Sequence, residues 1–380
     1  MTLAAVLSTT GVWLLRCLAV LLLLLTVLPF VSSGQWYVRV WDFPRLQILI
    51  ATVVVMLAWL LLSFTKWNNG LEILVWIILL VPCLLWQGSH LLRFSPLWSV
   101  EVPSVSQESP SHVKVMVANL KYENQDYQGA IEVVQEVAPD VLVLLELHEP
   151  WSNGLRPLHQ DYPYRVQEVR GEGLGMGLWS KTPLDNIEKR YLVSDRRVSI
   201  WATTEIEGQE IHITGVHPTP PGLKDSTGDK RRDSRVRDAE LVLVAREITD
   251  QPKQRTIVAG DFNDVAWSHT TRLFQRLSQM RDPRVGRSFL GTFPVDFPPA
   301  RMPIDHVFAS DGFGLLSMSR QVIPGSDHFA VVADFSLRPF DNAPERTKRP
   351  EKDDHQEAQK MIKEGEEDAE KRNVDQDSER

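Results

Sequence analysis

Polar side chains follow several apolar stretches of this chain, at points where strands would end. They form six groups along the chain: Asn119; Glu146; His217; Asp261 with Asn263; Asp305 with His306; and Asp327 with His328. A rigid sheet can hold side chains at its strand ends in a fixed arrangement. The pattern therefore predicts one site assembled from residues that are far apart in the sequence.

The residue types in these groups indicate the chemistry of the site. Carboxylates and amides without cysteine form an oxygen-rich set, which suits Mg²⁺ or Mn²⁺ better than structural zinc. Hydrolysis of a phosphate ester needs a group that activates water and groups that meet the charge growing on phosphoryl oxygens. Histidines and further carboxylates supply both.

Each group also has a plainer explanation when it is taken alone. The segment from Asp261 to Asp264 could be an Asx turn, and His217 an ordinary loop histidine. Glu146 could be a solvated strand end, and Asn119 could cap a turn. The combination of all six groups is what favours an active site.

The elements that must position these residues alternate between short apolar runs and a few helical patterns. Strands are predicted at 112–119, 141–145, 177–180, 198–205, 210–216, 256–259, 306–309 and 329–335, and helices at 127–137, 235–248 and 268–276. Many strands with few intervening helices indicate an α+β or layered sandwich rather than a doubly wound parallel sheet.

Three motifs follow Asn119, Glu146 and His217 in the chain: Gly260-Asp261-Phe262-Asn263, then Ile304-Asp305-His306, then Ser326-Asp327-His328. With these residues in this order, residues 112–337 resemble the endonuclease/exonuclease/phosphatase superfamily. The motifs are specific together and weak singly. The resemblance implies a four-layer α/β/β/α sandwich of two mostly antiparallel sheets, with the site at one end of the sheets.

For the metal, the resemblance implies that Glu146 is the principal ligand, supported by Asn119, and that Asp327 completes the environment. The sequence departs from the family at Leu145, where the family often has a glutamine. This removes an amide that could support the metal ligand.

For catalysis, the resemblance implies that Asp261 orients or activates the attacking water, with Asn263 contacting the phosphate. His217 and His328 would hold phosphoryl oxygens in the transition state. Asp305 would fix and polarise His328.

A basic segment at 230–237 follows His217 in a loop rich in Pro and Gly. It could be a solvated charge run at a helix start. Among its residues Arg237 is the best candidate for a contact with a phosphate-bearing substrate.

Three apolar segments precede this region, near 11–31, 46–64 and 71–88, and each is long enough to cross a bilayer as a helix. The first could instead be a cleaved signal peptide, and the third a buried hairpin. Charged residues flank both sides of the segments, so the compartment of the soluble region stays open. We expect a multi-pass membrane protein, of a bacterial inner membrane.

The remaining divisions are a linker at 95–110, a catalytic domain at 111–340 and a disordered charged tail at 341–380, which could be transiently helical between His355 and Glu370. More than half of the net charge of -8 lies in that tail. The middle region is near neutral, which argues against a dedicated binder of duplex DNA. Both cysteines, Cys17 and Cys83, lie in apolar segments, so no disulfide framework or thiolate zinc site is expected.

These observations predict a hydrolase of phosphate esters that requires a divalent metal and is anchored by its N-terminal helices. The substrate class stays open between a lipid headgroup, nucleic acid and a small phosphorylated molecule. No stable protein partner is expected. The alternative is a catalytically silent membrane scaffold that uses the sandwich or the charged tail for protein binding.

Overall fold

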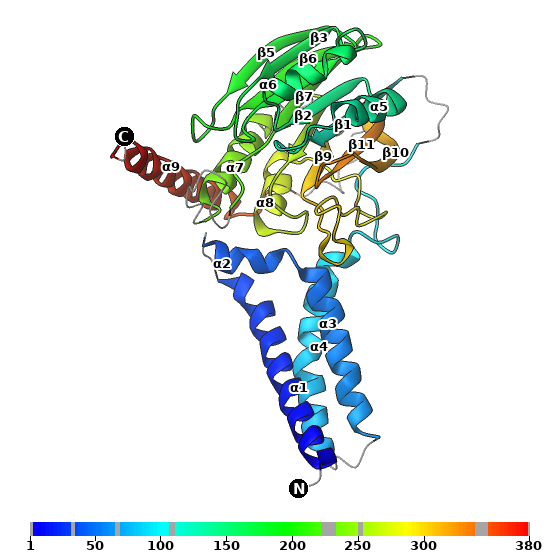
Figure 1. Cartoon of the computed structure of the whole chain (residues 1–380), viewed down its shortest axis with the longest axis vertical. Helices are drawn as coiled ribbons and strands as arrows, with labels where there is room; N and C mark the ends of the chain where they lie inside the picture. Colours follow the sequence, from blue (N-terminus) through cyan, green and yellow to red (C-terminus); the bar gives the residue numbers. More distant parts are fainter. Residues whose placement is uncertain are drawn as a thin grey trace.

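The computed structural model describes residues 3–31, 35–64, 69–105, 111–221, 233–249, 254–338 and 349–378. Its N-terminal part contains α1 (Leu3–Val27), α2 (Trp36–Arg39), α3 (Arg45–Leu62) and α4 (Gly70–Leu92). The described part has three segments long and apolar enough to cross a membrane, at Thr10–Phe30, Arg45–Leu62 and Gly70–Leu92. They pack side by side as a bundle below the rest of the molecule (Figure 1).

The first sheet contains six strands in the order β10-β11-β1-β2-β4-β3. They span Phe313–Val322 (β10), Phe329–Leu337 (β11), His112–Asn119 (β1), Val141–Leu145 (β2), Met176–Ser180 (β4) and Tyr164–Glu168 (β3). The pair β1 and β2 is parallel, and the other pairs are antiparallel. In the parallel pair Asn119 lies opposite Leu145, so Asn119 and Glu146 reach the same end of the sheet.

The second sheet contains five strands in the order β5-β6-β7-β8-β9. They span Leu184–Arg190 (β5), Ser199–Ile206 (β6), Gln209–Val216 (β7), Thr256–Asp261 (β8) and Asp305–Ala309 (β9). Here β7 and β8 form the parallel pair. Asp261 pairs with Asp305 across β8 and β9, which brings two carboxylates together at one end of this sheet as well.

The two sheets face each other, and helices cover their outer faces (Figure 1). Val115, Val143, Ile213 and Ile257 belong to the core between the sheets, where apolar side chains from both sheets are fully buried. Outside the first sheet lie α5 (Tyr127–Val137) and α6 (Glu149–Gly154); outside the second lie α7 (Arg235–Thr249) and α8 (His269–Ser278). This is the expected four-layer α/β/β/α sandwich, preceded by three apolar helices. Short 3₁₀ turns occur at Leu28–Phe30 (η1), Val40–Asp42 (η2), Arg156–His159 (η3) and Pro298–Ala300 (η4).

All the predicted strands and helices are present, with ends that differ by two residues at most. Three strands were not predicted: β3, β5 and β10. Each of them is the outermost strand of its sheet. Much of the surface of these three strands is exposed or half-buried, so their sequences lack the apolar run or clean alternation by which strands are recognised; β9, the fourth outer strand, is buried and was predicted.

The charged tail differs from the expected disorder. Residues Asp354–Ser378 form a helix, α9, which packs along α7. Ala358 and Ile362 are buried in the contact, and a side chain at Gly365 would collide with Ala239 at 2.4 Å. The few small and apolar residues of the tail thus suffice for docking because they share one helical face. Residues 341–348 lie outside the described residues.

The bundle and the sandwich meet in a packed boundary. Phe94 from the end of the bundle packs with Val265 and Trp267, which follow β8. Trp267 Nε1 also donates a hydrogen bond to Asp42 O at 2.6 Å. Val102, from the segment expected to be a linker, is buried in the core between the sheets. The described part of that segment is therefore attached to the sandwich.

Candidate active site

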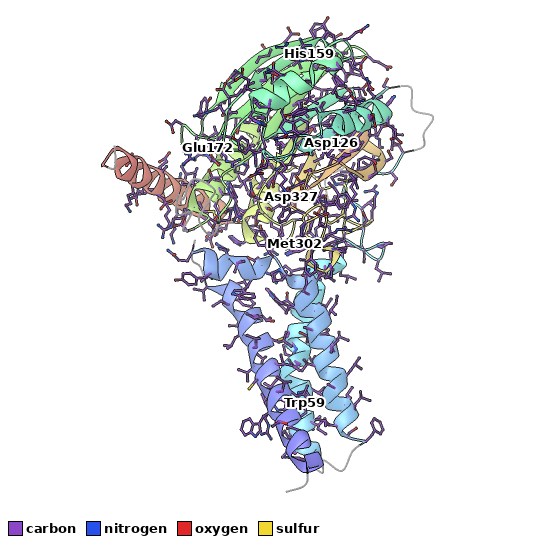
Figure 2. All side chains as sticks on the ribbon, viewed as in Figure 1. Trp59, Asp126, His159, Glu172, Met302 and Asp327 are labelled. Atoms are coloured by element: carbon purple, nitrogen blue, oxygen red, sulfur yellow. The ribbon has the colours of Figure 1, made fainter. Side chains whose placement is uncertain are left out.

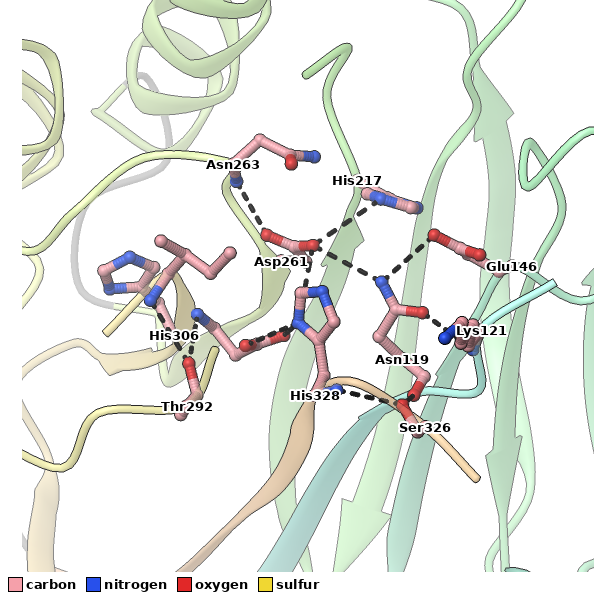
Figure 3. Close-up of polar contacts among 12 residues, drawn as sticks. Asn119, Lys121, Glu146, His217, Asp261, Asn263, Thr292, His306, Ser326 and His328 are labelled. Carbon is pink, nitrogen blue, oxygen red and sulfur yellow. Dashed lines mark hydrogen bonds and ion pairs between the residues drawn. The ribbon is translucent and has the colours of Figure 1, made fainter. Parts of the chain in front are cut away.

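Asp261 is the central residue of the site, at the end of β8 (Figure 3). Its side chain is buried, and its Oδ2 lies 3.8 Å from His217 Nε2 and 3.9 Å from His328 Nδ1. Asn119 Nδ2 lies 3.4 Å from the same oxygen. Strand ends from both sheets therefore converge on one carboxylate oxygen, as the sequence pattern predicted.

Glu146 faces Asp261 across the amide of Asn119. Asn119 Nδ2 lies 3.2 Å from Glu146 Oε1, so one amide group contacts both carboxylates. Glu146 Oε2 accepts a hydrogen bond from the backbone N–H of Tyr122 at 2.7 Å. Glu146 has a φ of 62°, a left-handed conformation that is uncommon for a residue with a side chain. Such backbone conformations persist where the surrounding structure imposes them, often at functional sites.

His328 forms a buried pair with Asp305. Its Nδ1 lies 3.0 Å from Asp305 Oδ2 and 3.2 Å from Oδ1. Burial lowers the pKa of the imidazole, but the charge of Asp305 and this hydrogen bond outweigh it and raise the pKa to about 10. His328 is therefore a cation at neutral pH. A fixed cation at this place can stabilise an anionic phosphoryl group.

Asp261 differs from an ordinary surface carboxyl in its affinity for protons. Burial and the negative charge of Asp305 outweigh the positive charge of His328, and together they raise the pKa of Asp261 to about 7. A carboxyl with a pKa near the working pH suits a group that accepts a proton from water.

Two residues in neighbouring loops, Thr292 and Ser326, hold the site residues in place. Their supporting role was not predicted from the sequence. Thr292 Oγ1 accepts hydrogen bonds from the backbone N–H groups of Ile304 and Asp305, both at 3.2 Å. Ser326 Oγ donates to Asn119 O at 2.7 Å and accepts from His328 N at 3.1 Å. Ser326 stands in a quoted motif, which is a signal for it; no signal marks Thr292.

The donor set fits a divalent cation. Glu146 and Asp261 present carboxylate oxygens on either side of one amide, and the negative charge of Glu146 contributes to the raised pKa of Asp261. Asp261, Asp305 and His328 also lie close enough together to hold an ion, within 4.8 Å. In that group, however, His328 is protonated and occupied by Asp305, so its ring is poorly suited to bind a metal. Glu146, facing Asp261, is the better candidate ligand.

A model of the Endonuclease/Exonuclease/phosphatase family matches residues 116–328, which include every residue of this arrangement. The chain belongs to this family. Members of the family are phosphoric ester hydrolases, in keeping with a site that joins carboxylates with a cationic imidazole.

Solved structures with a similar chain include humanized TDP2 from D. rerio, at 16% identity over 59% of this chain and 98% of that one, with a TM-score of 0.47. Sphingomyelinase C from Streptomyces griseocarneus has 16% identity over 60% and 99%, with a TM-score of 0.45. The human Nocturnin catalytic domain has 20% identity over 60% and 94%, with a TM-score of 0.45. No curated protein matches the chain.

Two of the expected site residues have other surroundings. Asp327 is partly exposed, and its closest ionic partner is Lys121, with Nζ 3.9 Å from Oδ2. Arg237, expected to contact substrate, is buried beneath the family's Gly-Asp-Phe-Asn turn. It donates to Asn263 O at 2.8 Å and pairs with Asp238 at 2.7 Å and Asp264 at 3.4 Å. Its guanidinium forms these contacts within the protein instead of facing a substrate. The expected substrate contact is therefore corrected: Arg237 supports Asn263.

Asn263 itself lies beside Asp261, as expected. Its backbone N–H donates to Asp261 Oδ1 at 2.7 Å, and its Nδ2 donates to Pro218 O at 3.0 Å. Its φ of 50° turns the chain sharply after β8. By contrast, His306 points away from the site: its Nε2 contacts Asp264 O at 2.8 Å, and burial lowers its pKa to about 3.

Proposed function

We propose that the chain hydrolyses phosphodiesters with the help of Mg²⁺ or Mn²⁺. The observation that carries this proposal is the convergence of two imidazoles and an amide on Asp261, next to Glu146. An arrangement of this kind can position water, accept its proton and hold phosphoryl oxygens within one site.

In this proposal Glu146 holds the cation, and Asn119 fixes the direction of the Glu146 carboxylate. A cation held there would supply charge neutralisation and polarisation at a phosphoryl oxygen. The fit rests on two facing carboxylates that only one neutral amide separates. Asp327 would act at the rim, because its exposed carboxylate points toward Lys121.

Asp261 orients a water molecule and accepts its proton as the oxygen attacks phosphorus. The His328 imidazolium donates hydrogen bonds to the phosphoryl oxygens, and Asp305 keeps it charged and oriented. His217 meets the phosphoryl group from the other side, since both rings approach the same oxygen of Asp261. Asn263 contacts the phosphate beside it. The P–O ester bond breaks, the leaving oxygen takes a proton from solvent and departs as the alcohol, and Asp261 releases its proton to solvent.

The substrate is proposed to be a phosphate ester at the membrane surface. The loop that carries Phe293, whose ring centre lies 4.7 Å from that of His328, continues to Pro299, whose carbonyl accepts a hydrogen bond from Gln47 in α3 at 2.7 Å. Phe297 in this loop is exposed. Figure 2 shows Met302 at the boundary with the helices, Asp327 near it, and His159 at the far end of the sandwich. A lipid headgroup would reach such a site directly.

We also propose that the protein is a multi-pass membrane protein, divided into a membrane region (1–94), a connecting segment (95–110) and the catalytic domain (111–340). The three apolar helices support the first part.

The test is hydrolysis by the full chain in neutral detergent, with bis(p-nitrophenyl) phosphate, p-nitrophenyl phosphate, lipid and DNA substrates. We expect diester cleavage with Mg²⁺ or Mn²⁺ that a chelator abolishes. Asp261→Ala and His328→Ala should each lower the rate by about 10³-fold or more, the range for loss of a general base or a preorganised charge.

The matched control is His112→Ala. His112 also pairs with an aspartate, Asp334 at 2.9 Å, but it lies at the opposite, exposed end of β1. Its removal should leave the rate unchanged. Absence of metal-dependent cleavage by the folded wild-type protein on every substrate would refute the proposal.

A further inference from the structure

A cavity of about 220 Å³ lies where the membrane-spanning helices meet the catalytic domain, and we call it the boundary cavity. Its lining includes Phe30 at the end of η1, Arg45 at the start of α3, Trp86 in α4, Arg272 in α8 and Glu357 in α9. A water molecule occupies roughly 30 Å³, so the cavity has room for about seven waters, or for a phosphate group and part of its ester. Figure 2 shows the side chains gathered at this boundary.

The cavity has more cationic than anionic side chains. Arg45 pairs with Asp42, and His269 with Glu357 at 2.7 Å, which leaves Arg39 and Arg272 in the lining. Within the described parts of the chain neither of these two arginines forms an ion pair. The lining has three arginines, Arg39, Arg45 and Arg272, but only two carboxylates, Asp42 and Glu357. Charges that are shielded from water are normally paired, so this surplus of one cation indicates a place for an anion.

Arg272 is the strongest sign of this surplus. Its Nε donates to the backbone carbonyl of Ser268 at 3.3 Å, a neutral acceptor. Burial and the nearby charge of Arg45 lower its pKa to about 10, so keeping the guanidinium charged costs free energy. In addition, Nε of Arg39 and Nε of Arg45 are buried without a hydrogen-bond partner among the described residues. An anion with several acceptor oxygens would accept hydrogen bonds from these donors.

The lining of the boundary cavity also includes apolar residues. Phe30 and Trp86 pack with ring centres 4.6 Å apart, and Pro29 and Val31 lie beside them. These residues stand at the ends of the membrane-spanning segments, the depth at which lipid headgroups meet acyl chains. A lining that combines cationic donors with apolar side chains at that depth matches a phospholipid better than a free phosphate ion.

We propose that the boundary cavity binds the phosphate group of an anionic membrane phospholipid, with Arg39 and Arg272 at the phosphate and Phe30 and Trp86 against the lipid's apolar part. The site is separate from Asp261 and His328, and it does not depend on the hydrolytic activity. The bound lipid would join the bundle to α8, because the cavity is lined by both.

The experiment uses the full chain in neutral detergent with a chelator, titrated with dioctanoyl phosphatidylglycerol and observed by native mass spectrometry, which counts intact bound lipid. We expect one tight lipid on the wild-type protein. Arg272→Gln and Arg39→Gln should each weaken binding about tenfold, as expected for loss of a charge-assisted hydrogen bond. Arg272→Lys should retain part of the affinity.

The matched control is Arg246→Gln, which removes an exposed arginine from α7 outside the cavity and should leave lipid binding unchanged. Inorganic phosphate and Phe30→Ala separate the two possible sources of the phosphate group. Competition only at high phosphate concentration, together with weaker lipid binding by Phe30→Ala, would support a lipid site.

Two results would overturn the inference. One is wild-type lipid affinity in both Arg272→Gln and Arg39→Gln, each with a wild-type melting temperature. The other is displacement of the lipid by phosphate at equal concentration without any effect of Phe30→Ala, which would make the site one for free phosphate.

Discussion

The active site and the boundary cavity both collect charged side chains away from water, but they compensate these charges differently. Around Asp261, His328 pairs with Asp305 and Arg237 pairs with Asp238 and Asp264, whereas Glu146 and Asp261 face each other across one neutral amide. In the boundary cavity Arg39 and Arg272 have no ionic partner among the described residues. The first arrangement keeps its groups oriented before any substrate arrives, while the second lacks a component that must come from outside.

The difference teaches how to interpret buried charge. Charges that are paired within the protein indicate preorganisation. Charges that are left unpaired, the facing carboxylates of the active site or the arginines of the boundary cavity, indicate a ligand. The following changes test this distinction, from the largest expected effect to the smallest.

The strongest test within the active site is Asp305→Asn. Loss of this negative charge leaves burial to dominate, so the pKa of His328 should fall and the imidazolium should be lost as the pH rises. We expect diester hydrolysis to fall about 10²-fold near neutral pH, with a steeper decline toward alkaline pH. The measurement is kcat/KM across pH 5 to 9.

Asp334→Asn is the matched control, since it removes the aspartate from the other histidine pair, at the far end of β1. An unchanged pH profile in Asp305→Asn would show that the buried pair does not set the charge of His328.

Glu240 allows the cost of a poorly compensated charge to be measured in the catalytic domain itself. It is buried, its Oε2 accepts from Thr219 N at 3.0 Å, and burial raises its pKa to about 7. Because the pKa in the folded state is above the unfolded value, the protonated form favours folding at low pH. This stabilisation is complete below the unfolded pKa and is lost as the pH rises through about 7.

Glu240→Gln keeps an acceptor for Thr219 N but cannot ionise. Relative to wild type, the variant should therefore gain on the order of 2 kcal/mol between pH 5 and pH 8. Melting temperatures of both proteins at these two pH values provide the test. A difference that does not depend on pH would mean that Glu240 keeps its ordinary pKa.

The smallest expected effect concerns the contact between the two regions. Trp267→Phe keeps an aromatic ring against Phe289 and Phe94 but removes the hydrogen bond to Asp42 O. We expect a loss of about 1 kcal/mol in stability, with hydrolysis of a soluble diester changed by less than about twofold. A large loss of activity without loss of stability would show that the boundary acts on the site directly.

The strands that carry the site were predictable because they are the buried ones. β1, β2, β7 and β8 are interior strands that read as continuous or alternating apolar segments, and Asn119, Glu146, His217 and Asp261 follow or end them. The edge strands β3, β5 and β10 face solvent and carry no comparable signal. For the charged tail the sequence left disorder and a transient helix between His355 and Glu370 open, and it did not predict the packing of α9 on α7, which depends on tertiary contacts.

The sequence by itself determined the class of the protein: the order and types of the motif residues specify the family, and the length of three apolar segments specifies helices that can span a membrane. Tertiary structure alone decided which charged side chains form ion pairs with one another. Arg237 and Arg272 are both arginines in helices near the same turn, yet one is enclosed by two aspartates and the other lines a cavity. Ionic pairing depends on distances of a few ångströms between distant segments, and such distances exist only after the sheets and helices have packed.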